Sequence, residues 1–129
     1  MDEFIIIDTD ILIDAGRKIR QAVDRLDQEE QVSTLAISVV VQMELLVGCR
    51  NKQEQSKLNR FLKRFQIVGL SEAIGNMSIE LLNRYHFSHG LLIPDSLIAA
   101  VALTMDAPLL SKNQKDYRFI DGLRLLPYP

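Results

Sequence analysis

The sequence has little of what several common functional classes require. It contains one cysteine, Cys49, two histidines and no tryptophan in 129 residues. A single cysteine cannot form an internal disulfide, and together with two histidines it cannot supply the four ligands of a zinc finger. We therefore expect a protein of a reducing compartment, the cytoplasm.

Long hydrophobic runs are also missing. The longest uninterrupted ones have seven residues, as in Leu97–Leu103, and are too short to cross a bilayer. The chain opens Met1-Asp2-Glu3-Phe4, with acids where a secretory signal needs cations, so no export signal is expected. Hydrophobic residues make up 47% and charged residues 25%, which excludes a disordered tail and predicts one globular domain over residues 1–129.

The charge is unevenly distributed along the chain. The net charge is -2, which argues against a general nucleic-acid coat protein. However, the segment Arg50–Arg64 carries six cations and one acid, Glu54. This basic segment either contacts RNA phosphates or forms a solvated helix face, and the sequence leaves both interpretations open.

Apolar patterns alternate between the strand period and the helix period. Strands are predicted at residues 4–7, 32–37, 66–70, 108–110 and 123–126. Helices are predicted at residues 9–15, 17–29, 39–47, 52–65, 71–90 and 95–105. This alternation predicts an α/β fold with a central parallel sheet of about five strands and helices on both faces.

Four acids stand where the site of an open parallel sheet is expected, near the carboxyl ends of the strands. Asp8 ends the first strand, Glu44 lies in the helix after the second, Asp95 opens the most apolar helix, and Asp116 follows the fourth strand. Ionised carboxylates next to a core are costly unless their charge is balanced. A divalent cation would balance it, and hard oxygen ligands favour Mg²⁺ or Mn²⁺.

Each acid taken alone also has a structural explanation. Asp8 can cap the following helix, Asp95 can interact with a helix dipole, and Asp116 can be an ordinary surface acid. Glu44 is harder to explain, because its neighbours are apolar and Val40 and Gly48 offer no basic partner. We expect Glu44 to have few solvent-facing options.

Four stretches of the sequence, in order and correctly spaced, resemble the PIN-domain family, in particular the VapC-type toxins of bacterial and archaeal toxin–antitoxin pairs. They are IIIDTDILID (5–14), ISVVVQMELLVG (37–48), IPDSLIAA (93–100) and LLSKNQKDY (109–117). The resemblance covers almost the whole chain. It implies a PIN fold, Mg²⁺-dependent endoribonuclease activity with Mn²⁺ able to substitute, an RNA substrate, an antitoxin partner and a homodimer.

The resemblance also implies roles for particular residues. Acids matching Asp8 and Asp95 hold the metal in the family, aided by the glutamate matching Glu44. Asp10 departs from the pattern, because Ser or Asn is more frequent at that position. The fourth acidic position is variable in the family.

At that fourth position Asn113 and Asp116 are both candidates. Asp116 is preferred because it can supply a negative charge. Ser111 is expected to hydrogen-bond the first-strand acid or a metal-coordinated water.

Further predictions concern the two histidines and four apolar residues. His86 and His89 are expected at the surface, at the end of the long helix. Four apolar residues are candidates either for a dimer interface or for ordinary core packing: Phe61, Leu62, Phe65 and Tyr117.

The expected chemistry is hydrolysis of an RNA phosphodiester. A metal ion makes water more acidic and neutralises charge on the attacked phosphate. Glu44 or Asp116 would orient the water or accept its proton. In-line attack would leave a 5′-phosphate and a 3′-hydroxyl.

Three other classes were weighed. A haloacid-dehalogenase-like phosphatase would use Asp8 and Asp10, with Lys112 on the phosphate, but it leaves Glu44 unexplained. A receiver domain lacks a phosphoacceptor, because no aspartate occurs between Val32 and Pro94. A non-catalytic PIN-like module that binds RNA or a partner remains open, and only an assay with and without Mg²⁺ decides against it.

Overall fold

The computed structural model describes residues 3–129, so the first two residues of the acidic N-terminal stretch, Met1 and Asp2, lie outside the described residues. The strands are β1 (Phe4–Ile7), β2 (Thr34–Ser38), β3 (Gln66–Val68), β4 (Leu109–Leu110) and β5 (Leu125–Leu126). The helices are α1 (Thr9–Gly16), α2 (Arg20–Glu30), α3 (Val39–Val47), α4 (Lys52–Leu62), α5 (Glu72–His89) and α6 (Ile93–Thr104). A short 3₁₀ turn spans Gln114–Asp116.

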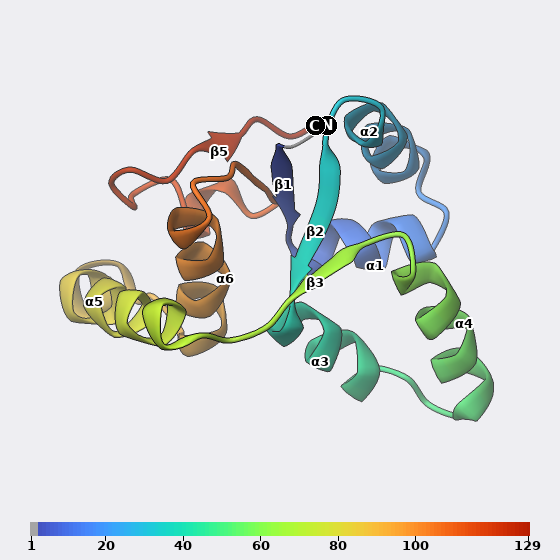
Figure 1. The fold of residues 1–129 in the computed structure, drawn as a ribbon, viewed down its shortest axis with the longest axis horizontal. Helices are drawn as coiled ribbons and strands as arrows, with labels where there is room; N and C mark the ends of the chain where they lie inside the picture. The colour runs from blue at the N-terminus through green and yellow to red at the C-terminus, as the bar shows by residue number, and fades with distance from the viewer. Residues whose placement is uncertain (1–2) are drawn as a thin grey trace.

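The strands form one parallel sheet in the order β3-β2-β1-β4-β5. β1 is central, with Ile6 paired to Ala36 on one side and to Leu109 on the other. Ile5, Ile6 and Ile7 are fully buried because helices cover both faces: α5 and α6 lie to one side of the sheet and α1 and α2 to the other (Figure 1). The predicted α/β architecture is confirmed.

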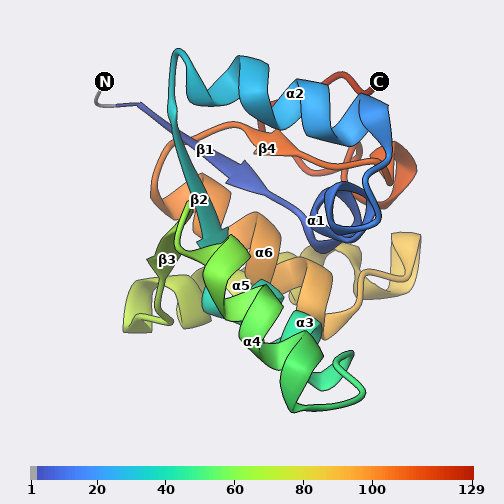
Figure 2. The same cartoon turned by 90° about the vertical axis from the view of Figure 1, so that its right-hand side faces the viewer.

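The sheet order places the functional end of the fold. From β1 the chain adds β2 and β3 on one side, whereas β4 and β5 are added on the other side of β1, so the strand order switches at β1. α1 starts directly at the carboxyl end of β1, and α3 starts at the carboxyl end of β2 (Figure 2). Ser38 caps α3 as predicted, accepting a hydrogen bond from the Val40 N–H at 3.1 Å.

Several predicted boundaries are wrong by two or three residues. α2 begins at Arg20 rather than 17, because the chain turns at Lys18, whose φ is 61°. β2 begins at Thr34, and Val32 is exposed. α4 ends at Leu62 rather than 65, because the chain turns there to bury Phe65 in the core. The end of α5 at Gly90 is confirmed, and its φ of 69° is a conformation that glycine adopts without strain.

Of the four apolar residues predicted to lie either in a dimer interface or in the core, three lie in the core. Leu62, Phe65 and Tyr117 are buried inside the protomer, and Phe61 is half-buried with its ring edge-on to Phe65. The alternative that these three residues form a dimer interface was therefore wrong. Across residues 3–129, no helix combines the length and hydropathy of a membrane span.

Candidate functional site

Asp8 lies at the carboxyl end of β1 and caps α1. Its side chain is only 5% exposed. One carboxylate oxygen accepts the Thr9 N–H at 2.8 Å, and the other accepts the Ser111 hydroxyl at 2.8 Å, which confirms the predicted Ser111 contact. Burial, with a contribution from nearby Asp10, raises the pKa of Asp8 to about 6, and the hydrogen bonds only partly offset this.

Asp10 joins α1 to the loop after β4. Its Oδ2 accepts the backbone N–H groups of Lys112 and Asn113, both at 3.1 Å, while its Oδ1 accepts the Ile11 N–H at 2.8 Å. Burial raises the pKa of Asp10, and these bonds oppose the rise. The acid that departs from the family pattern therefore has both oxygens occupied by the chain's own backbone.

Asp95 is half-buried in the first turn of α6. Its Oδ1 accepts the Tyr117 hydroxyl at 3.2 Å. Burial is the largest cause raising the pKa of Asp95; the charges of Asp116, Glu44 and Asp10 raise it further. The Coulomb contributions show that these acids, from four parts of the chain, lie within electrostatic range of one another.

The prediction that Glu44 has few solvent-facing options is wrong. Glu44 is exposed rather than enclosed, because Val41 is the only buried residue of α3 and its other apolar side chains are partly exposed, with Val47 87% exposed. Its Oε1 accepts the Thr9 hydroxyl at 2.8 Å, so a residue next to Asp8 holds it. No local pattern predicts this contact, which joins residues 35 positions apart.

The two candidates for the fourth position are both exposed. Asp116 ends the 3₁₀ turn and lies near enough to Asp95 to raise its pKa. Asn113 uses its backbone N–H on Asp10 and Ser111. Tyr117, which follows Asp116, was missed as a site residue, because its type and spacing predict core packing. His86 and His89 are exposed at the end of α5, as predicted.

These carboxylates have no ion-pair partner among the residues that the structure describes. In the part of the chain from Glu3 onward, no ion pair involves Asp8, Asp10, Glu44, Asp95 or Asp116. The Lys112 ammonium pairs instead with Asp14 of α1 at 2.8 Å, and it also lies within electrostatic range of Asp10. We call these five acids the acidic end of the sheet.

The acidic end fits a divalent cation in donor chemistry but is not closed around one. Within residues 3–129, no three Asp, Glu, His or Cys side chains are grouped closely enough to hold an ion as they stand. Mg²⁺ does not require such a cage, because it usually keeps several waters and takes one or two carboxylates. The donors are all oxygens, which suits Mg²⁺ or Mn²⁺ better than Zn²⁺.

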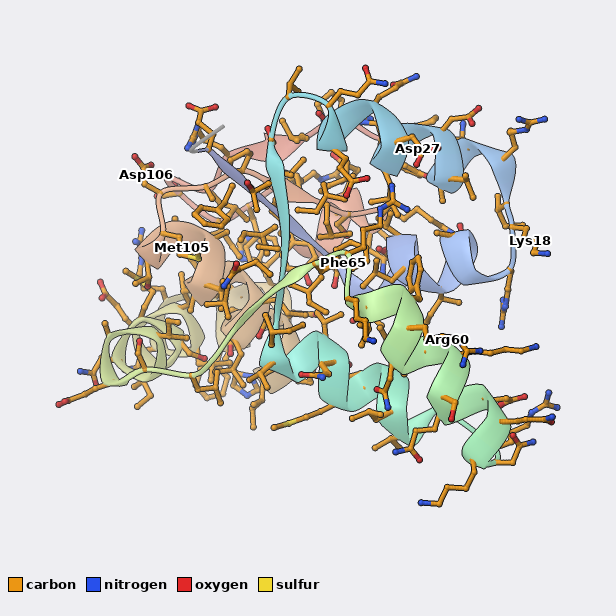
Figure 3. All side chains as sticks on the ribbon, turned by 45° about the vertical axis from the view of Figure 1, so that its right-hand side comes forward. Lys18, Asp27, Arg60, Phe65, Met105 and Asp106 are labelled. Atoms are coloured by element: carbon orange, nitrogen blue, oxygen red, sulfur yellow. The ribbon has the colours of Figure 1, made fainter. Side chains whose placement is uncertain are left out.

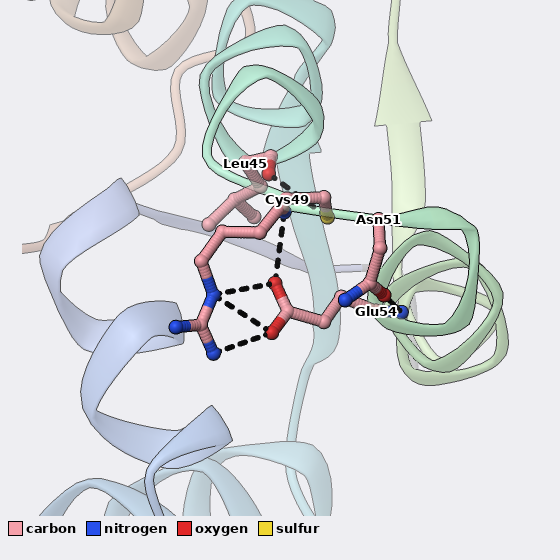
Figure 4. A network of polar contacts seen from close by, with 5 residues as sticks. Leu45, Cys49, Asn51 and Glu54 are labelled. Atoms are coloured by element: carbon pink, nitrogen blue, oxygen red, sulfur yellow. Dashed lines mark hydrogen bonds and ion pairs between the residues drawn. The ribbon is translucent and has the colours of Figure 1, made fainter.

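The basic segment has an uneven distribution of partners. Arg64 pairs with Asp27 and Glu30 of α2, and the Glu54 carboxylate accepts from the backbone and guanidinium of Arg50 (Figure 4). Among residues 3–129, Lys57 and Arg60 have no ion pair, and Arg60 points away from α4 (Figure 3).

A groove of about 920 Å³ runs between α1, α3 and α4. Its apolar lining includes Leu12, Leu45 and Phe61, while Arg17 and Lys57 add positive charge. A smaller adjoining hollow shares Arg17 and Leu45 and reaches Glu44. The groove therefore leads from the basic helix to the acidic end.

Comparison with known proteins agrees with the fold. The sequence model of the PIN domain matches residues 5–122. Ribonuclease VapC10 of Mycobacterium tuberculosis is 32% identical over 121 residues, covering 93% of this chain and 90% of that protein. Ribonuclease VapC1 of Methanocaldococcus jannaschii is 30% identical over 126 residues, covering 96% of this chain and 86% of that protein.

Solved structures give the same result. VapBC2 from Rickettsia felis, bound to a DNA fragment from its promoter, has a TM-score of 0.85 at 30% identity, covering 98% of this chain and 99% of that one. A toxin–antitoxin complex from Klebsiella pneumoniae has a TM-score of 0.80 at 30% identity, covering 95% of each chain. The chain therefore belongs to the PIN-domain family, and within it to the VapC type.

Proposed function

We propose that this protein is a Mg²⁺-dependent endoribonuclease and the toxin of a toxin–antitoxin pair. The observation that carries the proposal is the acidic end, where carboxylates from several elements lie within electrostatic range of one another and, among residues 3–129, have no ion-pair partner. Such a site is costly without a bound cation and attractive to one. The names of the relatives, ribonucleases of the VapC type, support the RNA substrate and the activity.

Asp8 and Asp95, aided by Glu44, are the residues that would hold Mg²⁺, with Mn²⁺ able to substitute. When bound, the ion supplies a more acidic water and neutralises charge on the attacked phosphate. Glu44 suits proton transfer because it is exposed and is held at one oxygen by Thr9, which leaves the other free of protein donors in residues 3–129. Asp116 is the second candidate for this role.

The phosphatase alternative is not favoured. Its second aspartate would be Asp10, but both oxygens of Asp10 are occupied by backbone N–H groups. Its phosphate-binding lysine would be Lys112, which pairs with Asp14. A general acid that accepts several hydrogen bonds is poorly placed to donate a proton.

Nuclease activity is tested with purified protein and RNA, in Mg²⁺ and in EDTA. We expect cleavage in Mg²⁺ that stops in EDTA, giving fragments with 5′-phosphate and 3′-hydroxyl ends. Hydrolysis of p-nitrophenyl phosphate without RNA cleavage would favour the phosphatase. RNA binding without cleavage under either condition would favour the non-catalytic module.

The antitoxin is the second proposed partner, in the cytoplasm. The structural neighbours include toxin–antitoxin complexes. The groove between α1 and α4, with its apolar lining and the cations Arg17 and Lys57, suits a segment that carries apolar and acidic side chains. We expect a small protein encoded immediately beside this gene to bind the toxin and to suppress cleavage. Loss of that binding in Phe61→Asp, with binding kept in the surface control Arg84→Ala, would place the contact in the groove.

The third proposed partner is a second copy of this chain, in a homodimer. The end of α5 and the start of α6 form an apolar hollow of about 630 Å³, lined by residues that include Leu91, Leu92 and Ile93, with Phe87 98% exposed. Exposed apolar side chains gathered in this way are typical of interaction surfaces. Phe87→Glu should shift the mass measured by light scattering from dimer to monomer. An unchanged mass would contradict this surface.

A further inference from the structure

Three hydroxyl groups, one from α1 and two from the segment after β4, reach three acids of the acidic end. Ser111 donates to Asp8, and Thr9 donates to Glu44, both at 2.8 Å. Tyr117 donates to Asp95 at 3.2 Å. A neutral donor stabilises a carboxylate without cancelling its charge, so these contacts orient the acids while leaving the site negative.

The Tyr117 donor is anchored in the hydrophobic core. The residue is 1% exposed and belongs to the core, so its ring cannot turn away from the site without opening the core. Backbone hydrogen bonds hold it on both sides, from its N–H to the Gln114 carbonyl at 3.2 Å and from the Ile120 N–H to its carbonyl at 3.0 Å. It therefore connects the loop after β4 to the first turn of α6.

We infer that Tyr117 is a positioning residue, whose buried hydroxyl holds the Asp95 carboxylate in one orientation at the acidic end. The inference rests on the proposed function, because it assigns Tyr117 to the site that would bind the cation. Burial, together with the charges of Asp8 and Asp95, raises the pKa of Tyr117 far above its usual value, so the phenol stays a donor. Its hydrogen bonding lowers the pKa of both carboxyls.

The chain provides a matched control in Tyr85. This tyrosine is also buried, at 7% exposed, and its hydroxyl also makes one hydrogen bond, accepting the Asp121 N–H at 3.1 Å. Its ring packs edge-on to His89 and Phe119, away from the acids. Tyr117→Phe and Tyr85→Phe therefore remove the same group from equally buried positions, and only the first touches the acidic end.

The first test measures RNA cleavage and Mn²⁺ binding in the two variants. Loss of a hydrogen bond to a charged group predicts that Tyr117→Phe lowers kcat about tenfold and raises by about tenfold the Mn²⁺ concentration that half-saturates the gain in Tm. KM for RNA should stay within about twofold, because the hydroxyl does not contact the substrate. Tyr85→Phe should match wild type in all three. Equal kcat and equal Mn²⁺ dependence in Tyr117→Phe and Tyr85→Phe would overturn the inference.

The second test needs neither metal nor RNA. In metal-free protein labelled with ¹³C and ¹⁵N, NMR couplings measure the χ1 rotamer populations of Asp95 at one fixed pH. Asp95 should hold one rotamer in wild type and in Tyr85→Phe, and should populate several in Tyr117→Phe. If wild type neither cuts RNA nor binds Mn²⁺, the proposed function fails, and the rotamer populations still decide whether Tyr117 positions Asp95. Unchanged Asp95 rotamer populations in Tyr117→Phe would overturn the inference.

Discussion

The acidic end of the sheet and the surface of α2 handle negative charge in opposite ways. On α2, carboxylates meet guanidinium groups: Arg64 contacts Asp27 at 2.7 Å and Glu30 at 3.0 Å, and Arg25 contacts Glu29 at 3.0 Å. At the acidic end the carboxylates accept only hydroxyl and backbone N–H donors within residues 3–129. These α2 carboxylates therefore have guanidinium partners, whereas the carboxylates of the acidic end have no cationic partner in an ion pair among residues 3–129.

This difference separates charges that support the fold from charges that are available for binding. Paired surface ions contribute little either way, typically less than about 1 kcal/mol. An unbalanced buried carboxylate destabilises the fold, and the raised pKa of Asp8, about 6, records that cost. Carboxylates that destabilise the metal-free fold are explained most simply by a ligand that their charge binds, and a divalent cation is the simplest such ligand.

The largest expected effect is on catalysis. Asp8→Asn and Asp95→Asn should each lower RNA cleavage by at least about a hundredfold, the loss expected for one strong electrostatic contribution. Glu44→Gln should act likewise and Asp116→Asn less. The matched acid from the paired surface, Asp27→Asn, should stay within about twofold of wild type in the same cleavage assay. Similar losses in all variants would erase the distinction between the two regions.

The next effect is on stability against pH in metal-free protein. Because the folded-state pKa of Asp8, about 6, lies above its unfolded value, 3.8, the folded state binds the proton more tightly. Its penalty is full at pH 7 and fades as pH falls through 6. Between pH 7 and pH 5 the free energy of unfolding of wild type should rise by about 1 kcal/mol relative to Asp8→Asn. Urea melts in EDTA measure the difference, and parallel profiles would show that Asp8 carries no such cost.

A smaller effect concerns the basic segment. If Lys57 and Arg60 contact RNA phosphates, Lys57→Ala with Arg60→Ala should flatten the slope of log affinity against log salt by about 1.5. The chemical step at saturating RNA should change little. Arg50→Ala, which removes a cation already held by Glu54, should change the slope less. An unchanged slope in the double variant would favour the other interpretation of α4, a solvated helix face that does not contact RNA.

The smallest effect is expected on the paired surface itself. Asp27→Asn removes one arm of the Arg64 contact, and should lower the free energy of unfolding by less than about 1 kcal/mol, with a loss that shrinks in high salt. Denaturant melts at two salt concentrations measure it. A loss of several kcal/mol would mean that the α2 charges support the fold far more than their exposure suggests.

Local patterns in the sequence predicted most of the fold. The β-branched run of β1, the Ser38 cap and the glycine end of α5 are each signalled by neighbouring residues, and each was confirmed. The turn at Lys18 was missed, because the apolar stripe of α2 continues through it without interruption. The exposure of Glu44 was missed for a related reason: an almost wholly apolar helix has no polar face to show which side meets solvent.

The site was predictable in residue types and not in contacts. Asp8, Asp95 and Ser111 follow from their places at strand and helix ends, and the Ser111 contact to Asp8 was confirmed. The donors Thr9 and Tyr117 reach acids 35 and 22 positions away, so only tertiary packing brings them together. Nothing in the spacing of Tyr117 distinguishes a core tyrosine from one whose hydroxyl serves a site.

The central claim, that the acidic end is a cation site, is tested most directly by thermal melts of wild type and Asp95→Asn in EDTA and in Mn²⁺. The asparagine keeps an oxygen for the Tyr117 hydroxyl and removes the charge. Because a ligand of the folded state stabilises it, wild type should melt higher in Mn²⁺ than in EDTA. Asp95→Asn should melt higher than wild type in EDTA and gain less from Mn²⁺. Equal melting temperatures for wild type in EDTA and in saturating Mn²⁺ would contradict the account.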